Sequence, residues 1–223
     1  MQYPDICVSE LFDLEHTIAA PLFDGVEYPW QVLGDISDFI CKLGPTLDSN
    51  LFEQRGDCVW VARNATVAPT AFIGGPAIID EGAEVRHGAF VRGSAIVGKG
   101  SVIGNSTELK NVVIFDSVQV PHYNYVGDSV LGYRSHMGAG AVTSNVKSDK
   151  SDISVNINGE RIQTGLRKMG AMLGDFVEVG CNSVLCPGAI IGRHSNIYPL
   201  SLVRGFVAAN SIYKKAGEVV QKY

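Results

Sequence analysis

The feature that most constrains this chain of 223 residues is an apolar residue at every sixth position. Ten successive positions of one series, from residue 61 to residue 115, are apolar, and six more follow between residues 173 and 203. A small residue stands four places after most of them. The first series consists of Val61, Val67, Ile73, Ile79, Val85, Val91, Val97, Ile103, Leu109 and Phe115.

A period of six matches neither the 3.6-residue period of a helix nor the two-residue period of an amphipathic strand. It is typical of a parallel β-helix, in which three hexapeptides form a triangular coil of about 18 residues and the coils stack. The aliphatic side chains then share one inward column, and glycines permit the corner conformations. We therefore predict an all-β solenoid over residues 56–208. The alternative, short antiparallel strands with a chance period, requires sixteen aligned positions to coincide.

Two interruptions of the repeat are expected to be informative. Phe115 and Leu131 are 16 residues apart where 18 are expected, which predicts a register slip near residues 120–126. The repeat is then absent over residues 143–172, a stretch that contains Asn158-Gly159 between two alternating runs. Asn-Gly favours a hairpin turn, so we predict an inserted arm that carries a β-hairpin. Long excursions of this kind are usually functional or interfacial.

The segments outside the repeat are expected to fold differently. Residues 1–55 hold two helical patterns, one over Val8–Ala20 and one that begins at Pro29 and ends at Gly44. We predict that they form a helical cap over the open first coil, because solenoids need covered ends. Residues 209–223 form a C-terminal tail, for which we expect a short helix.

Composition excludes several classes of protein. The net charge of −5 argues against a nucleic-acid-binding protein. No apolar run approaches the roughly 20 residues of a membrane span, and the first residues do not resemble a secretory signal. We therefore expect a cytoplasmic protein with no membrane partner. The five cysteines are odd in number and form no CxxC motif, so we predict neither a disulfide framework nor a zinc site.

Two cations break the repeat where glycine or alanine is common. Arg92 and Lys110 are 18 residues apart, one full coil, and are predicted to stack on one face. Unpaired neighbouring cations repel, so a phosphate or another anion is the partner we expect. The alternative is a solvated ladder of ion pairs with Glu84 or Glu108.

His122 is the candidate for proton transfer. It lies near the predicted register slip and within one coil of the cations, and Tyr123 and Tyr125 flank it where a strict repeat has small residues. A single histidine is more often structural than catalytic, so the assignment of His122 to proton transfer depends on the cations near it.

The stretch Pro121–Asp128, followed by Met137-Gly-Ala-Gly140 and Asn145, resembles a known family. It is similar to the acetyltransferase domain of the bifunctional N-acetylglucosamine-1-phosphate uridylyltransferase/glucosamine-1-phosphate acetyltransferases and of related sugar-1-phosphate nucleotidylyltransferases. The resemblance covers about residues 61–205, and it implies a left-handed parallel β-helix that forms homotrimers. It also implies an acyltransferase that moves an acetyl group from acetyl-CoA to an amino-sugar 1-phosphate, with no covalent intermediate and no metal. No Gly-rich phosphate loop precedes the repeats, so nucleotidyl transfer is not expected of this chain.

The resemblance also assigns roles position by position. His122 matches the general base, Asn145 contacts the amino sugar, and Glu108 matches a carboxylate near the base. The expected substrate-binding residues are Arg92, Lys110, Tyr125, His136 and Lys150, and the expected acetyl-CoA-binding residues are Ala139, Cys181 and Pro199. His136 replaces a family asparagine, and Lys150 adjoins Ser151, which stands at the position of the arm lysine.

Two other functions stay open at this point. The departures from the family pattern at His136 and Ser151 favour a non-catalytic trimeric scaffold, or a regulatory partner of a separate sugar-phosphate nucleotidyltransferase. A zinc hydratase of the same fold would use His87, His122 and His136, but their spacing does not suit a compact three-histidine site.

Overall fold

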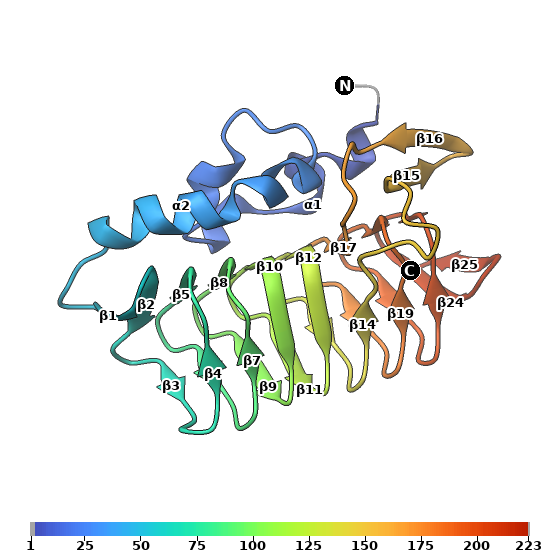
Figure 1. Ribbon diagram of the computed structural model, residues 1–223. Helices are drawn as coiled ribbons and strands as arrows, with labels where there is room; N and C mark the ends of the chain where they lie inside the picture. The colour runs from blue at the N-terminus through green and yellow to red at the C-terminus, as the bar shows by residue number, and fades with distance from the viewer. Residues whose placement is uncertain (1–2, 223) are drawn as a thin grey trace.

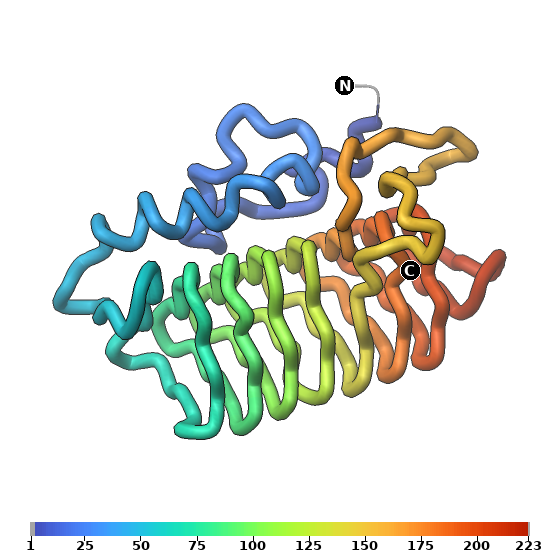
Figure 2. The backbone as a smooth tube through the Cα atoms, in the orientation of Figure 1, coloured from blue at the N-terminus to red at the C-terminus, as the bar shows by residue number. Residues whose placement is uncertain are grey.

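The computed structural model describes residues 3–222, and they form a triangular prism of stacked coils with helices along one side (Figures 1 and 2). Strands of successive coils pair in parallel with an offset of 18 residues, as in Ala77↔Ala95 and Val85↔Ile103. The architecture is the predicted one, an all-β solenoid of the left-handed parallel β-helix type with helices at its N-terminus and an inserted hairpin arm.

Three faces make up the prism, and each is named here for what lies outside it. The covered face comprises β2 (Val59–Ala62), β5 (Ala77–Ile79), β8 (Ala95–Val97), residues 112–114 of β10 (Glu108–Ile114), residues 129–131 of β12 (Tyr125–Leu131), β17 (Ala171–Leu173), β20 (Ala189–Ile191) and β23 (Phe206–Val207). The groove face comprises β3 (Thr66–Val67), β6 (Glu84–Val85), β9 (Val102–Asn105), β11 (Gln119–His122), β13 (His136–Met137), β18 (Glu178–Val179), β21 (Asn196–Ile197) and β24 (Ser211–Lys215). The polar face comprises β4 (Phe72–Ile73), β7 (Phe90–Val91), residues 108–110, residues 125–127, β14 (Val142–Thr143), β19 (Val184–Leu185) and β22 (Leu202–Val203).

The inward column follows the predicted period from Ile79 to Leu109, whose side chains are fully buried. Val67 and Ile73 are only half-buried, because no coil precedes theirs. Phe115 departs from the expected column. Ile114 takes the inward place opposite Val97, and the Phe115 ring packs instead against Phe12, with ring centroids 5.1 Å apart.

The register slip lies at a different place from the one predicted. The inward residues Leu109 and Ile114 are five positions apart, and Val126 and Leu131 repeat that shortened step. Both steps cross the same edge of the prism, from the polar face to the covered face, whereas residues 120–126 keep the regular spacing of six. Two single deletions at one corner therefore produce the shift of two residues, and β10 and β12 run through this corner without a break.

The arm leaves at that same corner, one coil later. Its hairpin pairs β15 (Ser154–Ile157) with β16 (Glu160–Gln163). Asn158 and Gly159 both have positive φ, at 51° and 83°, as a two-residue type I′ turn requires. The polar–covered corner thus carries both shortened steps and the insertion, so the departures from the repeat gather along one edge.

The N-terminal segment lies along the covered face and does not close the open end of the first coil (Figure 1). Helix α2 (Ile36–Leu43) contacts β5, β8 and β10, and the 3₁₀ helix η4 (Pro29–Gly34) contacts β12. The helix predicted over Val8–Ala20 is broken into α1 (Val8–Leu11), η2 (Leu14–His16) and the start of η3 (Ala20–Phe23), and the remaining 3₁₀ turns are η1 (Pro4–Ile6) and η5 (Gly44–Thr46). The reason for this placement is a second apolar row on the outside of the covered face, which needs to be buried: Ile78, Ile96, Val113, Val130, Met172 and Ile190.

The two ends of the solenoid finish in antiparallel pairs. Strand β1 (Phe52–Gly56) pairs with β2 at the start, and β25 (Glu218–Gln221) pairs with β24 at the end. The expected C-terminal helix is therefore wrong: the tail is a hairpin that adds to the groove-face sheet. No helix of residues 3–222 is long and apolar enough to cross a membrane.

A disulfide joins Cys41 of α2 to Cys58, which precedes β2. It was not predicted from the cysteine count, because the two residues come together only when α2 lies against the first coil, where their Cα atoms are 5.3 Å apart.

Candidate functional site

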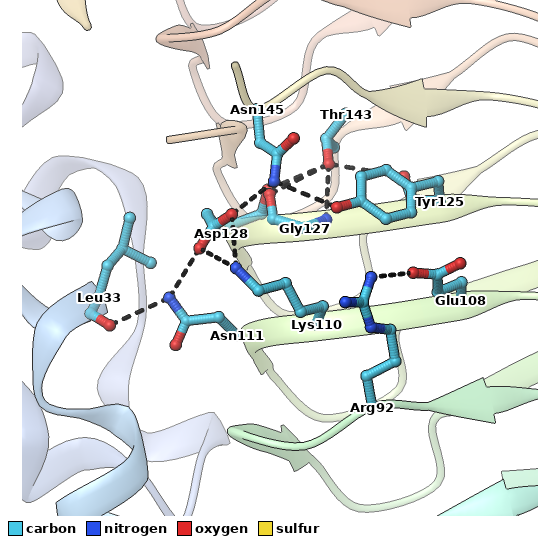
Figure 3. A network of polar contacts seen from close by, with 11 residues as sticks. Leu33, Arg92, Glu108, Lys110, Asn111, Tyr125, Gly127, Asp128, Thr143 and Asn145 are labelled. Atoms are coloured by element: carbon cyan, nitrogen blue, oxygen red, sulfur yellow. Dashed lines mark hydrogen bonds and ion pairs between the residues drawn. The ribbon is translucent and has the colours of Figure 1, made fainter. Parts of the chain in front are cut away.

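The polar–covered corner holds a network of polar side chains centred on Asp128 (Figure 3). Asp128 is 3% exposed and has a φ of 50°, and its carboxylate lies at the shortened corner, facing Asn111 and Asn145. One carboxylate oxygen accepts from Asn111 Nδ2 at 3.0 Å, and the other accepts from Asn145 Nδ2 at 2.5 Å. Asn111 also donates to the carbonyl of Leu33 in η4, which ties the network to the helices.

Lys110 and Arg92 do stack on one face, but each already has an acidic partner. Lys110 Nζ lies 3.1 Å from Asp128 Oδ1, in a pair whose side chains are 27% and 5% exposed. Arg92 Nη1 lies 2.7 Å from Glu108 Oε1 in a more exposed pair. The expectation of two unpaired cations was wrong, and the ladder with Glu108 is present. It arises because the register aligns residues 90–91 of β7 with the start of β10.

Tyr125 and Asn145 complete this side of the site. Asn145 Nδ2 donates to Tyr125 Oη at 3.1 Å as well as to Asp128. Burial raises the pKa of the Tyr125 phenol, and the negative charge of Asp128 raises it further. The phenol therefore stays protonated at neutral pH and remains able to donate a hydrogen bond.

His122 lies on a different edge, at the corner between the groove face and the polar face. Its side chain is exposed at the end of β11, and among residues 3–222 no hydrogen bond links it to Glu108. Backbone hydrogen bonds run along this edge from coil to coil: Gly140 N to the His122 carbonyl, Asn182 N to the Ala139 carbonyl and Leu200 N to the Cys181 carbonyl. His122, Ala139, Cys181 and Pro199 therefore follow one another along a single corner, with about 4.8 Å per coil.

Beside this line the groove face is hollowed by a cavity of about 460 Å³. His136, Cys181 and Pro199 line it, and His136 Nδ1 lies 2.8 Å from Glu178 Oε2. His136 thus faces the groove expected to hold acetyl-CoA, and it is not part of the network around Asp128.

Neither the expected contact of Lys150 with the substrate site nor the alternative three-histidine site is formed by the described residues. Lys150 stands in an exposed turn of the arm with a φ of 57°, and it has no contact with the polar network among the residues described. His87 Nδ1 contacts Thr70 Oγ1 at 2.6 Å, and within residues 3–222 no three His, Cys, Asp or Glu side chains lie close enough to hold a metal ion.

Asp128 and Asn111 were missed from the sequence. A signal existed, because each lies in one of the two shortened steps, where a polar residue follows an inward aliphatic one by two places. The signal could not be read without knowing that both steps cross the same corner.

Comparisons with known proteins identify relatives of this chain. The family described as "GMPPB C-terminal domain" matches residues 73–197. A bifunctional sugar-1-phosphate nucleotidylyltransferase/acetyltransferase of Sulfurisphaera tokodaii is 38% identical over 49% of this chain and 27% of its own length. The bifunctional protein GlmU of Methanococcus maripaludis is 32% identical over 90% of this chain and 49% of its own length. The putative uncharacterized acetyltransferase YaiX of Escherichia coli is 30% identical over 70% of this chain and 68% of its own length. The chain thus spans half or less of the two bifunctional relatives.

Proposed function

This chain belongs to the family of the GMPPB C-terminal domain, among the hexapeptide-repeat acetyltransferases, and on that premise we propose that it transfers an acetyl group from acetyl-CoA to the amine of an amino-sugar 1-phosphate. The observation that carries the proposal is the single corner along which His122, Ala139, Cys181 and Pro199 follow one another. On one side of it lies a groove, and on the other lies the polar face with Arg92 and Tyr125.

In this proposal acetyl-CoA lies along the groove with its thioester near His122. The backbone N–H groups of Ala139 and Cys181 have no acceptor among residues 3–222, so they are available to the acyl donor. Such groups stabilise the oxyanion that forms when an amine attacks a thioester carbonyl. Cys181 is exposed, but its proposed contribution is the backbone group and not its thiol.

The acceptor amine attacks only as the free base. The proposed role of His122 is to accept the amine proton as the C–N bond forms, and a proton then leaves with the CoA thiol as the C–S bond breaks. The amine adds directly to the thioester, so no covalent enzyme intermediate is required. Asn145 and Tyr125 are proposed to contact the amino sugar and its phosphate, and Glu108 to hold Arg92 in place.

The sugar phosphate would bind beside cations that are already paired. Arg92 uses only Nη1 in its contact with Glu108, so its remaining N–H groups are available to phosphate oxygens. Lys110 is held by the buried Asp128, and its proposed role combines attraction of the phosphate with support of the corner.

A homotrimer is the proposed assembly, because a groove open along one side of the prism can be completed by a neighbouring copy. Sedimentation should give three times the chain mass. A stable monomer at micromolar concentration would contradict this part of the proposal.

The direct test is release of free thiol from acetyl-CoA with glucosamine 1-phosphate, galactosamine 1-phosphate and their nucleotide-linked forms as acceptors. We expect thiol release with at least one phosphorylated amino sugar and little with the free sugars. The absence of release with every acceptor would contradict the proposal.

The pairing of both cations favours a second candidate, a trimeric scaffold or regulatory partner of a separate sugar-phosphate nucleotidyltransferase. In that case no acceptor would release thiol, and the purified chain would instead co-sediment with the nucleotidyltransferase.

A further inference from the structure

A second cavity, of about 510 Å³, lies beneath the arm on the side away from His122. One wall is the arm, from which Lys147 and Arg161 face it, and the other is the last coils of the polar face, which supply Cys186 and Arg204. Ser144, the residue before Asn145, lines its near end. The cavity therefore begins next to the polar network and extends toward the C-terminal end of the prism.

The walls of this cavity are packed in place. Ile153 and Val155 of the arm are fully buried. A Cβ added at Gly188 would lie 2.9 Å from the Ser154 carbonyl oxygen, and one added at Gly205 would lie 2.8 Å from that of Asn156. The arm strand thus rests directly on the backbone of two coils, and the cavity exists before any ligand binds.

The cations that line the cavity differ from most of those on the rest of the prism, although Arg134 also has no carboxylate partner among residues 3–222 and lies over the Tyr133 ring. Arg86, Arg92, Lys99, Lys110 and Arg193 each have a carboxylate within 4.0 Å. Arg161 and Arg204 have none among residues 3–222. Arg161 donates Nε to Ser154 Oγ at 2.7 Å, which fixes the guanidinium and leaves its terminal N–H groups available.

The remaining charged residues of the cavity, Lys147 and Asp149, leave its net charge positive. Lys147 donates to the carbonyl oxygen of Asp152 and has no carboxylate partner within the described residues. Asp149 is the one acidic residue in the lining, and the hydrogen bond from Ser151 N lowers its pKa. Asp149 therefore stays ionised and can accept hydrogen bonds from hydroxyl groups. With three cations and one carboxylate, the cavity has a net positive charge, although the net charge of the whole chain is −5.

From this cavity we propose a binding site for the diphosphate group of a nucleoside diphosphate compound. Two arginines held apart by rigid walls suit two linked phosphates, because each guanidinium forms a bidentate contact with one phosphate. Asp149 would accept a hydroxyl of the ribose. Acetyl-CoA and a nucleotide-linked amino sugar both carry such a group. The proposed function places acetyl-CoA along the groove face, so the amino sugar is the source that agrees with it, whereas the anion site itself does not rest on that function.

Calorimetric titration of the full chain with inorganic pyrophosphate, UDP, CoA and pantetheine tests the proposal. We expect pyrophosphate and at least one of UDP and CoA to bind, and Arg161→Gln and Arg204→Gln each to weaken that binding by about 10-fold or more. The matched control is Arg55→Gln, which removes an arginine paired with Glu53 in β1, outside both the groove face and the cavity, and should leave these affinities unchanged.

The probes also separate the two sources of the diphosphate. If Arg204→Gln weakens CoA but not UDP, the group belongs to the acyl donor, and the reverse result assigns it to the acceptor. The proposal would be overturned if pyrophosphate, UDP and CoA all failed to bind to the wild-type chain. It would also be overturned if the Arg161→Gln/Arg204→Gln double variant bound all three as tightly as wild type does. Because this readout is binding without turnover, it can fail while the acetyltransferase assay succeeds.

Discussion

The covered face and the polar face are built from the same coils, yet their outer surfaces differ completely. On the covered face the outward residues are apolar and fully buried, as Ile78 and Ile96 are, because the N-terminal helices lie over them. On the polar face the outward positions hold Phe90, Glu108 and Tyr125, which remain partly exposed. Both faces send aliphatic side chains into one column. The inward row therefore sets the fold, and the outward row decides whether a face receives helices or stays accessible to a ligand.

The largest expected effect is at the edge of the polar face. His122→Ala should lower turnover by about 10²- to 10⁴-fold, because the general base is lost, with no change in thermal stability. His87→Ala is the matched control, since His87 also follows an inward groove-face residue by two places. Steady-state kinetics measures both variants. Turnover of His122→Ala within a few-fold of wild type would mean that another group accepts the proton.

Asp128→Ala should lower the free energy of unfolding, because Asp128 holds together the corner between the polar face and the covered face. It leaves the Lys110 charge partly buried without a partner, and such a change destabilises a protein by about 3–5 kcal/mol. Glu108→Ala removes the partner of the more exposed Arg92 and should cost less than about 1 kcal/mol. Denaturant unfolding measures both variants, and equal losses would show that burial does not distinguish the two pairs.

A direct comparison of the outward rows follows from truncating one residue on each face. Ile96→Ala on the covered face should lower the free energy of unfolding by about 2–5 kcal/mol, because it opens a cavity under α2. Phe90→Ala on the polar face should lower it by less than about 1 kcal/mol, since that ring is 42% exposed. A larger loss from Phe90→Ala in the isolated chain would mean that the polar face is also covered.

Arg92→Ala should chiefly raise KM for the phosphorylated acceptor, by about 10- to 150-fold, since a charged hydrogen bond is worth about 1.5–3 kcal/mol. KM for acetyl-CoA should stay the same. Arg92→Lys should recover only part of the loss, because an ammonium group lacks the fork of a guanidinium. An unchanged preference for phosphorylated over free amino sugars would mean that Arg92 does not bind the phosphate and that its ion pair with Glu108 is purely structural.

The smallest effect concerns the covered face and pH. Burial raises the pKa of Asp80, beside β5, to about 6 from its ordinary value of 3.8. The folded chain therefore holds a proton that the unfolded chain has lost. The stability contributed by this proton is complete below about pH 4 and is lost as the pH rises through 6.

Asp80→Asn removes that dependence. Relative to wild type, its free energy of unfolding should rise between pH 4 and pH 7 by about 1–3 kcal/mol. Denaturant unfolding at several pH values measures the difference between the two proteins. A difference that stays constant with pH would show that Asp80 ionises normally in the folded chain.

The sequence alone predicted the solenoid, its inward column and the hairpin of the arm, because a period of six and an Asn-Gly turn are local signals. It also brought Arg92 and Lys110 together correctly, since their spacing of 18 is one coil. It misplaced the register slip, because two single deletions 17 residues apart look the same as one deletion of two residues when only the positions of the repeat are compared.

Tertiary structure decided which side chains meet across coils and where the helices lie. Asp128 became the partner of Lys110, Asn111 and Asn145 because both shortened steps and the arm share one corner. The N-terminal segment lies along the covered face because Ile78 and Ile96, which follow the period only as outward residues, need burial. Local sequence fixes the period of each coil. The pairing of cations and the choice of a face for the helices depend on residues far apart in the chain, whose proximity exists only after the coils have stacked.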